Sequence, residues 1–312
     1  MTAVDTQNMD ALFREAVAAI DAGDVPTLER HLAAHPALVR DRLDAPGAWL
    51  REKVGHAVEP GGFFERPYLL WFVAEDPVRN DRLPANIADI ARTIIEFARC
   101  QEVASLPEQV EYALRLVCWS WVARLCGVQI QLIDVLLDAG ALPDGEDVSH
   151  GRFGTHSDAA IYNGNFAAAE HLVQRGATLT LMVALGLGRW ADVERLAREA
   201  TLEDKQGAFI QAALNGQAEA LRRMLVLGVA PTTVSQRIQS HGTALHHAVW
   251  SGSLEAVKVL VEAGADIGRR DTIYDGTPLG WAEYALQEEN ENKPGKLYAE
   301  IASYLRAKGC EP

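Results

Sequence analysis

The chain has 312 residues, of which 48% are hydrophobic and 23% are charged, and its formal net charge is −14. This balance is typical of a globular protein and excludes a disordered one. Binding to phosphate groups needs dense Lys and Arg, so the charge argues against nucleic acid and anionic membranes as partners, and it is compatible with a protein partner that has a basic surface.

The cysteines and the apolar segments bear on the compartment. The four cysteines contain no C-x-x-C pair, and three of them lie in apolar helical patterns, as buried reduced thiols do. The first ten residues lack the apolar run of a secretory signal, and no stretch approaches the roughly 20 apolar residues of a spanning helix. We therefore expect a monomer in the cytoplasm.

Helix pairs that reverse at a glycine are expected along the chain, because glycine tolerates the positive φ of a tight turn. The first pair covers 10–39, with Asp24 as the N-cap of its second helix and Pro26 in the first turn. The next pairs cover 63–100, 107–142 and 149–177, and their first helices are expected at 68–74, 108–124 and 156–162. The turn glycines of the chain are Gly23, Gly127, Gly164, Gly188, Gly216 and Gly252.

Two insertions interrupt the N-terminal pairs. The inserted loop 40–67 is far longer than the usual span of about 2–8 residues between helices, and it carries Trp49, Phe63 and Phe64. It serves either as a cap that buries these aromatics over the first helix pairs or as a binding arm, since insertions in repeat proteins often lie on the binding face. A second insertion, 77–84, replaces the short turn of the second pair.

Further pairs follow at 178–200 and 204–229, and the next, at 238–266, shows why such pairs stack. In its second helix Leu254, Val257, Leu260 and Val261 form an apolar stripe along one face. One helix pair cannot bury such a stripe, whereas stacked neighbours bury it continuously. Each buried Leu or Val then stabilises the stack by about 1.5–3 kcal/mol.

The pair at 238–266 opens with the letters G-T-A-L-H-H-A from Gly242, and G-T-P-L-G-W-A returns 34 positions later at Gly276, in the last pair, 271–309. This core and period resemble the ankyrin repeat family, whose T-P-L-H-x-A signature recurs at about 33 residues. The resemblance implies an all-α solenoid of about eight helix pairs, with 1–312 as one array. In the family the motif histidine bonds the neighbouring backbone, so His246 is expected to be structural, and Gly280 replaces it in the last pair.

The resemblance also indicates a binding surface. In ankyrin proteins the residue two positions before the turn glycine faces the concave groove. Where a helix pair has an irregular turn, aligning its sequence on the T-P-L segment locates the equivalent position. Trp250 and Tyr284, from adjacent pairs, are the best interface anchors. The alternative is that they pack on each other or under a loop. The predicted groove residues are Trp250, Tyr284, Tyr162, Leu214, Glu75 and Asp76.

Polar side chains near the second insertion offer an alternative site. If this insertion bends over the groove, they line a small-molecule pocket with the 40–67 loop; otherwise they belong to a solvated charged loop. The residues concerned are Arg79, Asn80, Arg124 and Gln129.

Catalytic motifs are absent from the sequence. It contains no G-x-S-x-G, no H-E-x-x-H and no P-loop with lysine. His31 and His35 are four apart on a helix but lack a third ligand, so a surface pair is expected. We therefore expect no catalytic residue, no metal and no cofactor. The predicted function is a non-enzymatic protein–protein interaction module that uses the concave groove and the loop tips. The alternative is an enzyme or a binder of a small metabolite; a chaperone or an immunity-type partner of a toxin is also compatible.

Overall fold

The computed structural model describes residues 3–74, 82–145, 154–288 and 296–311, and within these ranges all regular secondary structure is helical. The described residues fall into two compact units. The N-terminal unit lies within 1–149 and 155–178, and the C-terminal unit lies within 150–154 and 179–312.

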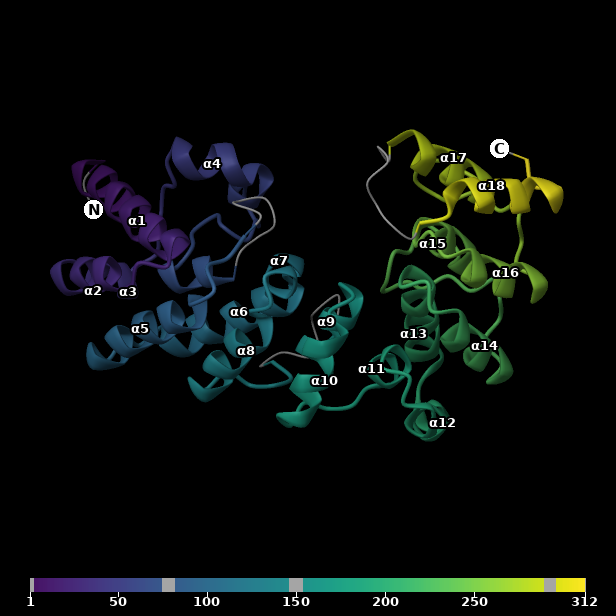
Figure 1. Ribbon diagram of the computed structural model, residues 1–312, viewed down its shortest axis with the longest axis horizontal. Helices are drawn as coiled ribbons and strands as arrows, with labels where there is room; N and C mark the ends of the chain where they lie inside the picture. The colour runs from purple at the N-terminus through teal and green to yellow at the C-terminus, as the bar shows by residue number, and fades with distance from the viewer. Residues whose placement is uncertain (1–2, 75–81, 146–153, 289–295, 312) are drawn as a thin grey trace. The chain divides into compact units, whose positions relative to one another are not determined.

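The N-terminal unit begins with the longest described helix, α1, which has 20 residues. Its helices are α1 (Ala3–Ala22), α2 (Val25–Ala34), α3 (Ala37–Arg40), α4 (Ala48–Val54), the 3₁₀ helices η1 (Gly55–Val58) and η2 (Leu69–Val73), α5 (Ile87–Cys100), α6 (Leu106–Trp119), α7 (Trp121–Leu125), α8 (Gln129–Asp138), α9 (His156–Tyr162) and α10 (Phe166–Gln174). Two rows run through this unit (Figure 1): α1, η2, α6 and α9 pack in succession, and so do α2, α5, α8 and α10.

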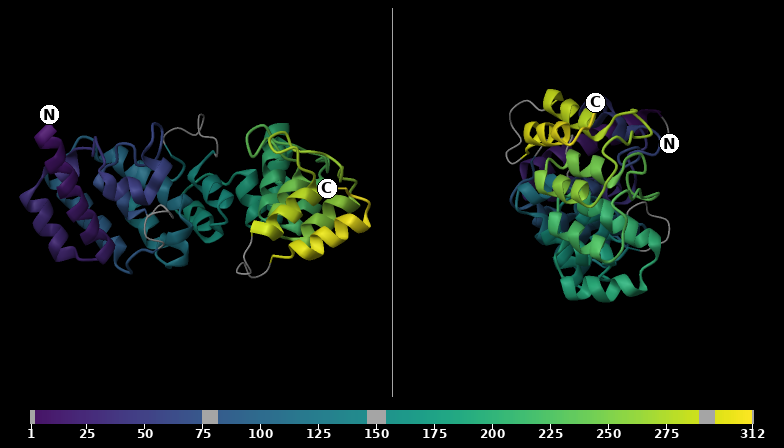
Figure 2. Two further views of the ribbon diagram at one scale, coloured as in Figure 1. Left: turned by 90° about the horizontal axis from the view of Figure 1, so that it is seen from above. Right: turned by 90° about the vertical axis from the view of Figure 1, so that its right-hand side faces the viewer.

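The C-terminal unit repeats the same two-row plan. Its helices are α11 (Leu181–Gly186), α12 (Trp190–Glu199), α13 (Leu202–Leu214), α14 (Ala218–Val226), α15 (Ala244–Trp250), α16 (Leu254–Glu262), α17 (Pro278–Glu288) and α18 (Tyr298–Ala307). The first helices α11, α13, α15 and α17 pack in succession, and of the second helices α14 packs on α16 and α16 on α18. The pair α17 and α18 lies side by side in all views (Figure 2). The predicted all-α helical-repeat fold is therefore confirmed.

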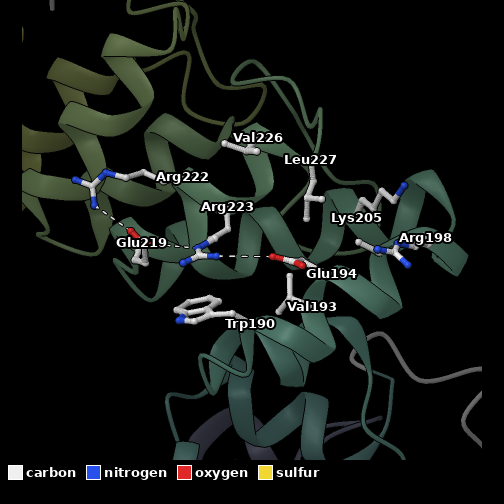
Figure 3. Close-up of a pocket in the computed structure, with 11 residues that line it drawn as sticks. Trp190, Val193, Glu194, Arg198, Lys205, Glu219, Arg222, Arg223, Val226 and Leu227 are labelled. Atoms are coloured by element: carbon white, nitrogen blue, oxygen red, sulfur yellow. Dashed lines mark hydrogen bonds and ion pairs between the residues drawn. The ribbon is translucent and has the colours of Figure 1, made fainter.

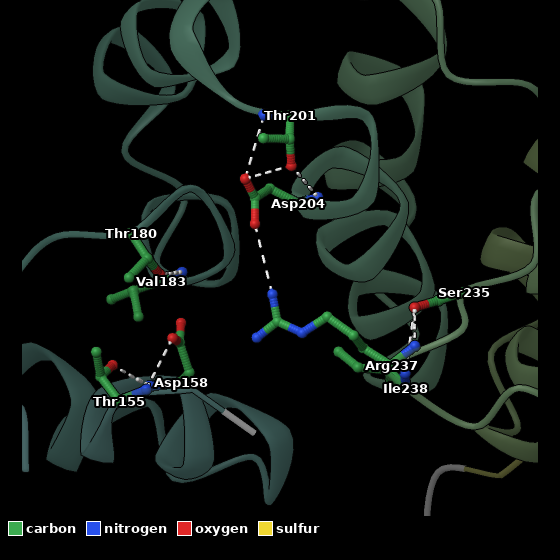
Figure 4. Close-up of polar contacts among 9 residues, drawn as sticks. All are labelled: Thr155, Asp158, Thr180, Val183, Thr201, Asp204, Ser235, Arg237 and Ile238. Atoms are coloured by element: carbon green, nitrogen blue, oxygen red, sulfur yellow. Dashed lines mark hydrogen bonds and ion pairs between the residues drawn. The ribbon is translucent and has the colours of Figure 1, made fainter. Parts of the chain in front are cut away.

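Side-chain caps fix where several helices begin. Thr201 and Asp204 form a capping box at the start of α13, in which each side chain accepts a hydrogen bond from the other residue's backbone N–H (Figure 4). Asp24 caps α2 as predicted, since its carboxylate accepts a hydrogen bond from the Thr27 N–H at 3.0 Å. Such caps satisfy backbone donors that have no partner inside the helix. Figure 4 also shows Arg237 reaching Asp204.

The tight turns and the apolar stripes follow the sequence prediction. All six predicted turn glycines have positive φ, from 65° at Gly216 to 72° at Gly127. On α16, the predicted stripe residues Val257 and Leu260 are fully buried, whereas Leu254 and Val261 at the edges of the stripe are half-buried. Since both the turns and the stripes are local properties of the chain, the sequence was sufficient to predict them.

Three predicted elements were wrong in detail. Segment 68–74 is a 3₁₀ helix rather than an α-helix; its residues Leu69 to Val73 are all buried, and a short tight helix accommodates them. The expected helix 108–124 is broken at Ser120, whose hydroxyl accepts a hydrogen bond from the Ala123 N–H and starts α7. The inserted segment 40–67 is not a loop throughout, because it contains α4 and η1. In addition, Cys100, expected to be buried, is exposed at the end of α5.

Candidate partner-binding site

The two predicted anchor residues lie on the first-helix row of the C-terminal unit. Trp250 is the last residue of α15 and is 46% exposed, and Tyr284 lies on α17 and is 54% exposed. They do not stack on each other: Trp250 meets the ring of Trp281 edge-on, with centroids 6.1 Å apart, and Tyr284 makes no ring contact with another described residue. Because Trp281 and Tyr284 are three apart on α17, they share one helix face.

Trp281 connects Trp250 to a second group of aromatic rings. The imidazole of His241 stacks on Trp281 with centroids 5.6 Å apart, and Tyr274 meets His241 edge-on at 6.1 Å. Tyr274 is 74% exposed, and its neighbour Ile273 is exposed too. We call Tyr274, His241, Trp281, Trp250 and Tyr284 the aromatic strip. Its members come from two loops, which supply Tyr274 and His241, from the end of α15 and from α17.

Asp271 holds the centre of the aromatic strip in place. Its carboxylate accepts a hydrogen bond from the indole Nε1 of Trp281 at 2.9 Å and three more from the backbone N–H groups of Ile273, Tyr274 and Gly276. Burial by itself raises the pKa of Asp271, but these four hydrogen bonds outweigh it and hold the pKa at about 2. One ionised carboxylate therefore fixes both the loop tip and the Trp281 ring.

Gly276 allows the indole to approach this loop closely. A Cβ at Gly276 would lie 3.0 Å from Cδ1 of Trp281 and 3.1 Å from the Asp271 carboxylate. A side chain there would therefore displace the ring or the carboxylate, which explains why the second copy of the motif begins with glycine.

The histidines behind the strip are structural. His246 is fully buried; its Nδ1 accepts a hydrogen bond from the Thr243 N–H at 3.2 Å, so its Nε2 carries the proton and donates to the Gly276 carbonyl at 3.1 Å. His247 bonds the Gln239 carbonyl through Nε2. Burial lowers the pKa of His246 and lowers that of His247 to about 4, so both are neutral at pH 7. As expected from the motif, His246 joins the α15 start to the next loop.

The strip offers hydrophobic contact rather than chemistry. The ring nitrogens of His246 and the Nε2 of His247 form hydrogen bonds with backbone groups. The carboxylate of Asp271 already accepts four hydrogen bonds. Among the described residues no group of three His, Cys, Asp or Glu side chains has the arrangement of a metal site. Nor does any described helix combine the length and the apolar character needed to cross a membrane.

The other predicted groove residues do not join the strip. Tyr162, on α9, packs against Trp119 with ring centroids 5.6 Å apart, and Leu214 ends α13 half-buried. Glu75 and Asp76 lie outside the described residues. The aromatic strip thus contains two of the predicted residues, Trp250 and Tyr284.

The alternative pocket is described only in part. Arg79 and Asn80 lie outside the described residues. Arg124 donates to the Gly164 carbonyl at 2.6 Å, and the buried amide of Gln129 donates to the carbonyls of Val117 and Ser120. The Arg124 bond links two successive helix pairs of the N-terminal unit, whereas the Gln129 bonds join the start of α8 to the end of α6 within one pair. The pocket itself stays a prediction.

The aromatics of the 40–67 insertion mostly face inward. Phe64 is fully buried against Phe72, with ring centroids 5.0 Å apart. Trp49 stacks on the same ring at 6.4 Å, and its Nε1 donates to the carboxylate of Asp10 on α1. Only Phe63 of the three is exposed. These contacts favour the cap over the binding arm.

Sequence reasoning missed three members of the strip: His241, Tyr274 and Trp281. Trp281 lies inside the second copy of the motif, G-T-P-L-G-W-A. A large ring so close to the motif's glycines was a signal that it packs against the loop. His241 and Tyr274 lie in loops outside the repeat signature, and only the folding of those loops brings them together.

Comparisons with known proteins agree with the repeat motif. A family model described as ankyrin repeats, in three copies, matches residues 158–271. Among solved structures, the chain is similar to the human ASB11 ankyrin repeat domain, with 19% identity and a TM-score of 0.35 over 64% of this chain and 84% of that one. It is also similar to an ankyrin repeat domain from Acinetobacter baumannii AYE, with 24% identity and a TM-score of 0.34 over 64% of this chain and all of that one. No curated protein matches the sequence.

Proposed function

We propose that this chain, which belongs to the ankyrin repeat family, binds a protein partner through the aromatic strip of its C-terminal unit. Ankyrin repeats are in general protein–protein interaction modules, and stacked repeats present extended surfaces for this purpose. The observation that carries the proposal is the continuous line of rings from Tyr274 to Trp250, which are exposed at both ends and held at the centre by Asp271.

The strip has the composition of an interface core. Trp and Tyr are enriched among the residues that dominate binding energy, because they bury a large area and lose little conformational freedom. Trp281 is already fixed by a hydrogen bond and by the packing at Gly276. Because this ring is ordered before binding, a partner does not have to supply the free energy of ordering it.

The charge of the chain supports the kind of partner expected from the sequence. With a net charge of −14, the protein attracts a partner with a basic surface and repels an acidic one at long range. We therefore infer that the partner brings apolar side chains to the strip and carries positive charge around them.

Affinity purification followed by measurement of dissociation constants tests this proposal. Partners captured by the wild type are compared with those captured by the double variant Trp250→Ala/Tyr284→Ala and by Tyr274→Ala. The expected loss in affinity is at least about thirtyfold for the double variant, since a single anchor residue already contributes about 2 kcal/mol or more. Leu202→Ala is the matched control, because Leu202 is an exposed apolar residue of the same unit outside the strip.

The outcome that rejects the proposal is specific. If the double variant and Tyr274→Ala both bind the captured partner as tightly as the wild type and the Leu202 control do, the strip is not the binding surface. Circular dichroism of each variant shows whether a lost interaction reflects the surface or a loss of folding.

A further inference from the structure

A groove opens between the two second helices α12 and α14 of the C-terminal unit. Its volume is about 610 Å³, and its apolar lining includes Trp190, Val193, Val226 and Leu227. Figure 3 shows Trp190 and Val193 on one wall and Arg223 and Leu227 on the other. The groove is made by the second helices α12 and α14, with Lys205 of α13 at one end, whereas the aromatic strip lies along the loops and the helices α15 and α17. It is therefore a separate surface.

The groove exists because one connection in the repeat is unusually short. Only Ala200 and Thr201 separate α12 from α13. In contrast, the connection from α14 to α15 is a long loop that runs from the end of α14 at Val226 to the start of α15 at Ala244. In Figure 1 α12 is seen nearly end-on while α14 runs obliquely, so the two helices diverge. Elsewhere in the row, α14 packs on α16 and α16 on α18. Of the apolar lining, Val226 on α14 is 88% exposed, whereas Val193 on α12 is buried.

The charge of the groove is opposite to that of the chain. Its lining holds four cationic side chains, Arg198, Lys205, Arg222 and Arg223, and two acidic ones, Glu194 and Glu219, although the chain as a whole carries −14.

The four cations divide into two groups. Arg223 lies over the Trp190 ring at 5.1 Å and pairs with Glu219 at 2.9 Å, and Arg222 pairs with Glu219 and Glu255. The positive charges of Arg222 and Arg223 are thus compensated by acidic side chains of the protein. These two residues form the end of the groove near Trp190.

At the other end of the groove, Arg198 and Lys205 both contribute to the lining (Figure 3), and neither side chain has an ion pair with another described residue. Two uncompensated cations beside an apolar lining match a ligand that combines carboxylates with apolar side chains. A purely apolar occupant would leave both cations without a counter-charge.

We propose that the groove between α12 and α14 binds a short acidic amphipathic peptide segment of a partner protein. An apolar side chain of the peptide enters between Trp190, Val193 and Leu227, and a carboxylate pairs with Arg198 and Lys205. The net negative charge of the surrounding protein repels acidic segments elsewhere. Recognition is thus confined to the groove and depends on the apolar anchor as well as on the charge.

Selection from a library of random short peptides displayed on phage, with the full chain as the target, tests this inference. Peptides are expected to emerge that are rich in Asp or Glu and contain Leu, Phe or Trp. The synthesised peptides are then measured by fluorescence anisotropy against Arg198→Glu/Lys205→Glu and against Val226→Asp. We expect each variant to weaken binding about tenfold or more, and added salt to weaken binding to the wild type.

Matched controls separate the groove from general charge and from the strip. Arg195→Glu reverses a charge on α12 outside the lining, and Leu202→Asp adds a charge at an exposed apolar position outside it; both are expected to bind the peptides as the wild type does. Trp250→Ala/Tyr284→Ala is also expected to retain binding, so failure of the strip proposal leaves this result intact. The inference is overturned if no selected peptide loses affinity on the groove variants, or if those that do are basic.

Discussion

The two units differ in where they place their main clusters of aromatic side chains. In the N-terminal unit Phe64, Phe72 and Trp71 are buried, and the inserted segment that supplies Phe64 folds back on the first helices. In the C-terminal unit Trp250, Tyr284 and Tyr274 are exposed. In the N-terminal unit, whose repeats are irregular, these aromatic side chains thus pack in the core. In the C-terminal unit, which follows the repeat signature most closely, they lie at the surface. Departure from the repeat is therefore a poor guide to the binding face.

The largest expected effect comes from the aromatic core of the N-terminal unit. Phe64→Ala removes a fully buried ring that packs on Phe72, so we expect it to lower the free energy of unfolding by about 3–5 kcal/mol. Urea unfolding followed by circular dichroism measures this loss. The neighbouring exposed ring supplies the control: Phe63→Ala is expected to cost less than about 1 kcal/mol. Equal losses for the two variants would contradict the cap interpretation.

A pH dependence of about 3 kcal/mol is expected from His247. Its pKa is about 4 when folded, against 6.5 without the fold. Between these values the unfolded chain binds a proton that the folded chain excludes, so the stabilisation is complete above about pH 6.5 and is lost as the pH falls toward 4. Two and a half pKa units correspond to about 3 kcal/mol. Urea unfolding across this range measures the slope.

The N-terminal unit should show the same dependence of the free energy of unfolding on pH, because it too contains a buried histidine. Burial, followed by the charge of Arg115, lowers the pKa of His156 in the N-terminal unit to about 4 as well. His156→Gln and His247→Gln are each expected to flatten the dependence below about pH 6.5. If neither variant changes the slope, acid sensitivity comes from other groups.

A smaller effect is expected from the anchor of the strip. Asp271→Asn replaces a carboxylate that accepts four hydrogen bonds with an amide that has one acceptor oxygen, so we expect a loss of about 1–3 kcal/mol. NMR of the tryptophan indole protons should show a shift at Trp281. Asp275→Asn, at an exposed carboxylate nearby, should stay within about 0.5 kcal/mol. An unchanged indole signal in the Asp271 variant would mean that this carboxylate does not hold the ring.

The smallest effect on stability is expected at the exposed end of the strip. Trp250 is 46% exposed, so Trp250→Ala loses its edge-to-face contact with Trp281 and only part of the burial of a core ring; its free energy of unfolding should fall by about 1–2 kcal/mol, and that of Tyr284→Ala by less. Thermal unfolding compared with wild type measures both. A loss of several kcal/mol would identify these rings as core residues and would remove the contrast between the two units.

The sequence predicted the repeat fold because the decisive signals are local. A tight turn needs positive φ, and glycine supplied it at Gly23 and Gly216 as at Gly252. The buried stripe of α16 and the N-cap at Asp24 likewise depend on residues within one or two helical turns. The segment 68–74 failed as an α-helix because burial on all sides, which is a property of the neighbours, decided its form.

The candidate site divides in the same way. The motif identified Trp250 and Tyr284 by their place in the repeat, and it assigned His246 a structural role. It could not predict that His241 and Tyr274 would stack in line with Trp281, since these residues come from two separate loops, which are joined where the Thr272 N–H donates to the His241 carbonyl. Nor could it predict the groove between α12 and α14, which depends on how far one helix diverges from another. Periodicity along the chain determines which residues turn and which are buried against the next repeat. The packing of distant loops and helices decides which exposed side chains share one surface.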